Sequence, residues 1–233
     1  MKLLKITTIF ALTGCMLVQI GCSSMSNTGK GALIGGGSGA GLGAALGAII
    51  GGGKGAAIGA SIGAAVGTGA GALIGNKMDK QQKQLEEELA QAATVEETTD
   101  QNGLRAIKVT FNGGILFPTN GTSLSSSAKA ELTRFAQSLN SNPDTDVQIY
   151  GFTDNTGGLE VNQRVSTGRA EAVRTYLLNS GVASYRLYAE GLPMQDYVAS
   201  NATAEGRAQN RRVEIYITAN QAMIDKANAG TLQ

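Results

Sequence analysis

The chain has 233 residues, 33 glycines, a formal net charge of +1 at pH 7, no histidine and no tryptophan, and its two cysteines are Cys15 and Cys22. Without histidine or a later cysteine, the rest of the chain cannot form a Ser-His-Asp or Cys-His nucleophile, a structural zinc site or an internal disulfide. The near-neutral charge, without a long Lys/Arg block, argues against nucleic acid as a partner. We therefore expect a protein that is not an enzyme, with no cofactor and no metal site.

The first 21 residues have the layout of a secretory signal peptide. Lys2 and Lys5 lie before a largely apolar stretch at residues 6–20, and small residues follow. We expect residues 1–21 to direct export and to be removed.

The segment Gly21-Cys22-Ser23-Ser24 resembles the processing site of bacterial lipoproteins, where a diacylglyceryl group is attached to the cysteine. The resemblance implies that Cys22 carries fatty acids such as palmitate and begins a short tether over residues 22–30. Ser23 resembles the residue that sorts lipoproteins to the outer membrane. Two alternatives stay open: lipidation at Cys15, because Leu12-Thr13-Gly14-Cys15 fits the lipoprotein consensus, and a plain signal peptide with incidental cysteines.

A glycine falls at every fourth position from Gly31 to Gly75. The segment is also an internal duplication, because Lys30-Gly31-Ala32 recurs as Lys54-Gly55-Ala56 in the same glycine register. The intervening residues are mostly Ala, Leu, Ile and Val, whereas flexible linkers are rich in Ser, Pro and charge. The pattern favours a membrane-associated segment, with a flexible linker as the alternative.

Glycines spaced four apart form a groove that lets two helix backbones approach closely in a membrane. We expect a helical hairpin over residues 31–75, with helices at about 31–50 and 56–75, each close to the roughly 20 residues that span a bilayer. The segment resembles the glycine zippers of outer-membrane lipoproteins. Such close contact would also permit a homo-oligomer.

Residues 76–103 are predicted to connect this hairpin to a folded domain. An apolar stripe at helical spacing predicts a solvated connecting helix, with a short coiled coil as the alternative. The stripe comprises Met78, Leu85, Leu89 and Ala92. Residues 93–103 lose this periodicity and are predicted to be a linker.

Residues 104–218 are predicted to form an α+β domain of βαβαββ type, with helices packed on one face of a mixed sheet. Ile107, Val109 and Phe111 alternate as in a half-buried strand. Helical spacing is seen in Ala128, Leu132, Phe135 and Leu139. The further expected elements are strands near 147–152, 186–190 and 211–218, a second helix at about 159–179, and a C-terminal tail at 219–233.

Several separated blocks of this domain resemble the OmpA-like C-terminal domain. The blocks are Gly151-Phe152-Thr153-Asp154-Asn155-Thr156-Gly157, then Asn162, Ser166 and Arg169-Ala170, then Asn201, Gly206-Arg207 and Asn210-Arg211-Arg212-Val213-Glu214-Ile215. They occur in the order and at the spacing of that family. Phe152 and Pro118 depart from it, since many relatives have His and Asp at these positions.

One arginine of the second predicted helix points toward its apolar side. On a helical wheel Arg169 shares a stripe with Val165 and Ala172, whereas Arg164 and Arg174 point away. A buried guanidinium needs a compensating partner, and Asp154 at the end of a strand is the nearest candidate acid. The alternatives for this partner are an acidic side chain, as in a purely structural Asp154–Arg169 ion pair, backbone carbonyls, and a bound anion.

The OmpA resemblance implies that Asp154 and Arg169 bind diaminopimelate in the stem peptide of peptidoglycan. That residue offers an ammonium for Asp154 and a carboxylate for the guanidinium of Arg169. The family also implies contacts from a loop after the first strand and from the Asn-Arg-Arg motif. The further candidate binding residues are Asn162, Thr156, Thr119, Asn120, Asn210 and Arg211. Arg212 is expected to brace the fold.

These features together predict a lipoprotein that tethers the outer membrane to peptidoglycan. The partners would be peptidoglycan and membrane lipid, with acylated Cys22 in the outer membrane and the C-terminal domain in the periplasm. An alternative is a wall-anchored component of a channel or stator-like complex built on the glycine-zipper helices. Against it, the predicted helices carry no ionisable residue in their interiors, which proton relays normally require.

Overall fold

The computed structural model describes residues 68–100, 102–118 and 121–233. Several predictions lie outside these residues: the signal peptide at 1–21, lipidation at Cys22 or Cys15, the tether at 22–30, the first zipper helix and most of the second, and the positions of Thr119 and Asn120.

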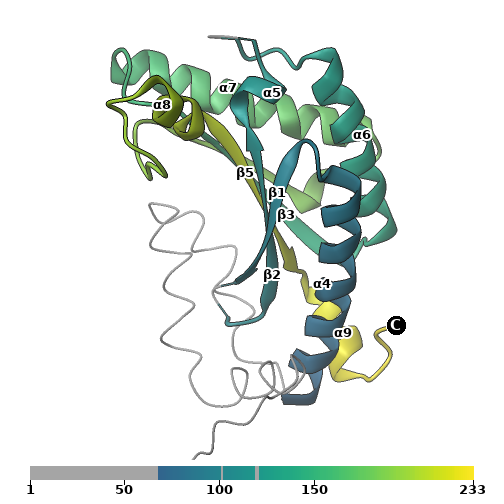
Figure 1. Ribbon diagram of the computed structural model, residues 1–233. Helices are drawn as coiled ribbons and strands as arrows, with labels where there is room; N and C mark the ends of the chain where they lie inside the picture. Colours follow the sequence, from purple (N-terminus) through teal and green to yellow (C-terminus); the bar gives the residue numbers. More distant parts are fainter. Residues whose placement is uncertain (1–67, 101, 119–120) are drawn as a thin grey trace, which may run out of the picture.

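A five-stranded mixed sheet forms the centre of the domain, in the order β1-β2-β5-β3-β4 (Figure 1). Only β3 and β4 pair in parallel, and the other neighbours are antiparallel. The strands are β1 (Ala93–Thr99), β2 (Arg105–Asn112), β3 (Thr145–Phe152), β4 (Leu187–Leu192) and β5 (Arg212–Ala219). The predicted α+β class with a mixed sheet is confirmed.

Two long helices, α6 (Ser126–Ser141) and α7 (Leu159–Asn179), cover one face of this sheet (Figure 1). Ser125 caps α6 by accepting a hydrogen bond from the amide of Ala128. The predicted apolar stripe of α6 is fully buried in the main core, against alternate residues of the strands. The shorter elements of the described residues are α5 (Gly113–Leu116), the 3-10 turn η1 (Ser184–Arg186), α8 (Ala204–Asn210) and α9 (Gln221–Asn228).

The predicted solvated helix is instead part of the core. Helix α4 (Thr68–Leu89) runs without a break across the predicted boundary at residue 75 and packs against α6, α9, β1 and β2. Met78, Leu85 and Leu89 are fully buried in the same cluster as the sheet residues. Within the described residues, no helix is both long enough and apolar enough to cross a membrane.

The predicted linker at residues 93–103 is also wrong, because its first part forms β1. All seven residues of β1 pair with β2, from Ala93 opposite Phe111 to Thr99 opposite Arg105. The turn between the strands is held by Asp100, whose Oδ1 accepts hydrogen bonds from the amides of Asn102 and Leu104. Strand β1 lacks a clear apolar alternation because it lies at the sheet edge, where cross-strand pairing replaces burial.

The predicted C-terminal tail forms helix α9, which packs against α4. Met223, Ile224 and Ala227 are buried in the main core, and Asn220 caps the helix by accepting a hydrogen bond from the amide of Met223. Segments at the two ends of the domain therefore pack together beside the sheet (Figure 1).

This packing predicts that α4 contributes directly to stability. Leu85→Ala should lower the free energy of unfolding by about 2–5 kcal/mol, because truncation of a fully buried leucine leaves a cavity. Urea unfolding of the full chain measures the difference. Leu73→Ala on the same helix is the control, since Leu73 is 36% exposed and its truncation should cost less. Equal unfolding midpoints for wild type and Leu85→Ala would show that α4 is a solvated connector.

Candidate functional site

A cavity of about 900 Å³ opens where β3 ends and α7 begins. Its lining contains one carboxylate, Asp154, and a set of arginines. These arginines are Arg164, Arg169, Arg207 and Arg211. The excess of positive charge would attract a ligand that carries negative charge.

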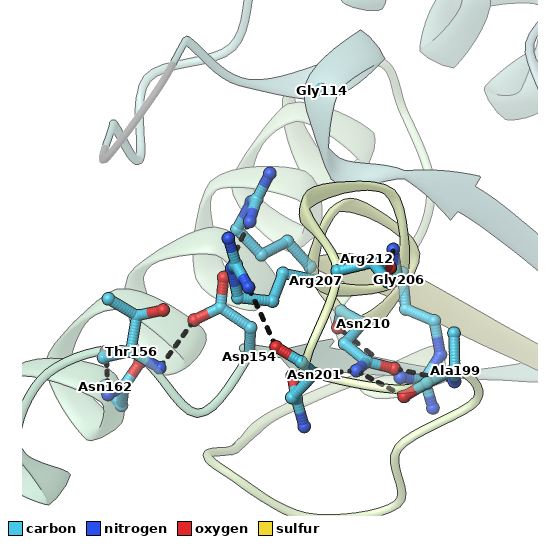
Figure 2. A network of polar contacts seen from close by, with 12 residues as sticks. Gly114, Asp154, Thr156, Asn162, Ala199, Asn201, Gly206, Arg207, Asn210 and Arg212 are labelled. Atoms are coloured by element: carbon cyan, nitrogen blue, oxygen red, sulfur yellow. Dashed lines mark hydrogen bonds and ion pairs between the residues drawn. The ribbon is translucent and has the colours of Figure 1, made fainter.

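Asp154 follows the last residues of β3, and its side chain is only 8% exposed. One carboxylate oxygen, Oδ2, accepts a hydrogen bond from Arg211 Nη1 at 2.6 Å. The other, Oδ1, accepts one from the amide of Thr156 at 2.8 Å (Figure 2). Partial burial alone would raise the pKa of Asp154, but the hydrogen bonds from Arg211 and Thr156 and the charge of Arg211 together lower it. Asp154 is therefore a stable anion at neutral pH.

Arg169 lies inward on α7, as predicted, and is only 4% exposed. Its Nε donates to the carbonyl of Gly121 at 3.1 Å, and its guanidinium lies 5.3 Å from the ring centroid of Phe117. Burial, and then the charge of Arg211, lower the pKa of Arg169, while Asp154 opposes this shift. Arg169 is thus a buried cation whose described hydrogen bond goes to a neutral carbonyl.

The salt bridge of Asp154 is formed with Arg211 and not with Arg169. The structural Asp154–Arg169 ion pair, one of the alternatives, is therefore not the arrangement in this structure, and the described hydrogen bond of Arg169 goes to a backbone carbonyl. Arg211 reaches Asp154 from the residue just before β5, and the sequence did not indicate that it would be the partner.

Asn162 holds the loop that carries Asp154. Its Nδ2 donates to the carbonyls of Thr156 at 2.9 Å and Gly158 at 3.1 Å, across the start of α7 (Figure 2). Gly157 between them has a φ of +86°, a conformation that side chains disfavour. Asn162 and Thr156 therefore both lie at the site. Their described hydrogen bonds fix the conformation of the loop between β3 and α7.

Asn210 is fully buried beside the site, and its side chain is used within the protein (Figure 2). Its Oδ1 accepts from the amides of Val198 and Ala199, and its Nδ2 donates to Ala199 O and Asn201 Oδ1. These hydrogen bonds hold the loop before α8. They leave the Asn210 side chain little capacity for further hydrogen bonds to a ligand.

Arg207 lines the cavity although it was not among the predicted site residues. Its Nη1 donates to Asn201 O at 2.8 Å. Gly206 before it packs on Ser200, where an added Cβ would lie 2.0 Å from the carbonyl oxygen. The sequence could have indicated Arg207, because Gly206-Arg207 is one of the blocks that resemble the OmpA-like domain.

Arg212 braces the fold, as predicted. It is buried, its Nε donates to Glu214 Oε1 at 2.7 Å and its Nη2 donates to Asp196 O at 2.9 Å. Its guanidinium stacks 3.9 Å from the ring centroid of Phe152. Phe152, where relatives often have His, therefore supports Arg212.

The OmpA family model matches residues 116–211, which include Asp154, Arg169 and Arg211. The predicted resemblance of this segment to the OmpA family is therefore confirmed. The YMGG-like Gly-zipper model matches residues 1–79, which confirms the resemblance to glycine zippers. The OmpA family is non-enzymatic, in agreement with the prediction from composition.

Two relatives and one solved structure resemble the OmpA-family part. The probable lipoprotein YiaD of Escherichia coli K12 is 40% identical over 104 residues, 45% of this chain and 48% of YiaD. The peptidoglycan-binding protein ArfA of Mycobacterium tuberculosis H37Rv is 44% identical over 112 residues, 48% of this chain and 34% of ArfA. The chain thus spans about half the length of YiaD and about a third of ArfA.

The solved structure is that of the cell wall anchor of the T6SS from Pseudomonas aeruginosa. It is 32% identical with a TM-score of 0.52, and the match covers 60% of this chain and 99% of that one. The likeness supports the fold of the domain independently of the short family motifs.

The geometry around Asp154 predicts a pH-dependent contribution to stability. Because its folded pKa is lowered, the contribution is fully present above about pH 4 and is lost as the pH falls through the folded pKa. Asp154→Asn should therefore unfold at lower urea than wild type at pH 6, and the gap should close on acidification toward about pH 2. An equal gap at both pH values would show that the Asp154 charge does not stabilise the fold.

Proposed function

We propose that this protein is a non-catalytic lipoprotein that tethers the outer membrane to peptidoglycan by binding the diaminopimelate of the stem peptide. The observation that carries the proposal is that a buried cation, Arg169, and an anion, Asp154, both line the wall of one cavity. A ligand that contains an ammonium and a carboxylate close together matches this pair of charges.

Diaminopimelate has the required chemistry, because each of its ends can present an amino group and a carboxylate. The planar guanidinium of Arg169 suits a carboxylate, and the carboxylate of Asp154 suits an ammonium. We assign Asn162 and Asn210 to positioning of the surrounding loops, and Thr156, Thr119 and Asn120 to further ligand contacts. The names of ArfA, a peptidoglycan-binding protein, and of the cell wall anchor support this ligand class.

The other half of the proposed tether is the N-terminal anchor. Acylated Cys22 and the zipper segment would hold the chain in the outer membrane, with the OmpA-family domain in the periplasm. YiaD is named a probable lipoprotein, and further relatives are named outer membrane proteins. These names support an envelope location for this chain.

Removal of the charged side chain of either Asp154 or Arg169 should strongly weaken binding to peptidoglycan. Asp154→Ala and Arg169→Ala should each weaken co-sedimentation of the full chain with purified peptidoglycan more than tenfold, since truncating one member of a buried charged contact costs roughly 2–5 kcal/mol. Arg134→Ala is the control, because the side chain of Arg134 is 48% exposed, pairs with Glu131 on α6 and does not line the cavity. It should sediment like wild type.

Thermal melting of the same variants separates binding from folding. Variants that are still folded at the assay temperature yet no longer sediment support the site. If both variants are folded at that temperature and still sediment with peptidoglycan, the proposed site is wrong.

The anchor gives a second prediction. Cys22→Ala should abolish labelling of the protein by a fatty-acid probe, because acylation requires its thiol, whereas Cys15→Ala should retain the label. The opposite result would place the lipid on Cys15, and labelling of both variants would mean that neither thiol alone is required.

A further inference from the structure

The proposed partner for the ligand ammonium is already occupied in this structure. Asp154 Oδ2 is 2.6 Å from Arg211 Nη1, and Asp154 Oδ1 accepts the amide of Thr156. An ammonium can reach this carboxylate only by displacing Arg211 or by sharing the carboxylate with it.

The two residues of this ion pair differ in exposure. The side chain of Asp154 is 8% exposed, whereas that of Arg211 is 40% exposed. Arg211 can therefore move away from Asp154 without becoming a buried, unpaired charge. Asp154 cannot move in the same way, and it needs a replacement cation when Arg211 leaves.

The backbone at Arg211 is fixed, so the exchange requires only a change of side-chain rotamer. The amide of Arg211 donates to Arg207 O at 3.1 Å, and its carbonyl accepts from the amide of Gly113 at 2.8 Å. The next residue, Arg212, is anchored by Glu214. Arg211 thus carries a partly exposed side chain on a backbone that is held by hydrogen bonds.

The neighbouring arginine decides which ligands can drive this exchange. Arg169 is buried, and its described hydrogen bond goes to the carbonyl of Gly121. If an ammonium alone displaced Arg211, both arginines would face the cavity with no anion between them. A carboxylate on the same ligand would compensate Arg169 and the released Arg211 together.

On the basis of the proposed function, we infer that Arg211 is a displaceable counter-ion that selects for zwitterionic head groups. Asp154 accepts an ammonium only when the same ligand brings a carboxylate to receive Arg211. The site therefore rejects simple amines, such as lysine side chains, which offer a cation with no adjacent anion. Arg211 is a specificity-determining residue in this scheme.

Three ligands of matched length test the exchange. meso-Diaminopimelate carries both charges at each end, cadaverine carries only the ammonium groups, and pimelate carries only the carboxylates. Each is titrated calorimetrically into the full chain in detergent. Wild type should bind diaminopimelate best and cadaverine least.

Arg211→Gln should free Asp154 for simple amines. The ratio of diaminopimelate affinity to cadaverine affinity should fall by about tenfold or more, because cadaverine no longer has to break the ion pair. Cadaverine should bind more tightly than it does to wild type, and pimelate should bind less tightly. Arg211→Lys keeps the positive charge and should keep the ratio closer to that of wild type.

Arg134→Gln is the control, since Arg134 lies on α6, pairs with Glu131 and does not line the cavity. It should leave the affinity ratio unchanged. Melting temperatures establish that all variants are folded. A gain in cadaverine binding cannot arise from loss of structure.

The outcomes distinguish this inference from the proposed function. If wild type does not bind diaminopimelate, the proposed function fails and the inference fails with it. If wild type binds diaminopimelate but Arg211→Gln keeps the wild-type ratio, or weakens all three ligands equally, only the role of Arg211 as a counter-ion is overturned.

Discussion

The site depends on the burial of one guanidinium, that of Arg169, on the inward face of α7. An uncompensated buried cation is very unfavourable, so the structure around Arg169 has to supply acceptors. Helix α7 lies close to the sheet because Gly151 and Gly191 have no side chains: an added Cβ would lie 2.3 Å from Ser166 O and 2.3 Å from the amide nitrogen of Thr167. This close approach brings Arg169 to the end of β3, beside Asp154.

Two adjacent arginines at the start of β5 have different partners, because successive residues in an extended chain point in opposite directions. Arg211 points into the cavity and meets Asp154, whereas Arg212 packs beneath Phe152 and pairs with Glu214. The buried arginine is held by several contacts, and the exposed one is held by a single salt bridge. The two arginines therefore differ in how firmly their side chains are held.

Much of the fold could be predicted because burial leaves a periodic pattern in the sequence. The alternation of Ile107, Val109 and Phe111 and the inward direction of Arg169 both follow from that pattern. Strand β1 could not be predicted in this way, since Thr and Glu at an edge are stabilised by pairing with β2. The periodic pattern could not predict which arginine pairs with Asp154 either. Several arginines lie near the site, and only the three-dimensional geometry identifies Arg211 as the partner.

The path of α4 determines how the domain would respond to a mechanical load. The helix begins at the end of the domain opposite α5 and α8, beside which the cavity lies, and runs along the sheet in contact with α6 and α9 (Figure 1). Tension between an anchored N-terminus and a ligand in the cavity would therefore act along these packed elements and shear them past one another. Shear has to break many contacts at the same time, whereas peeling breaks them one after another. A strain on the envelope would thus be resisted by the whole core at once, with the lifetime under force governed by the unfolding rate.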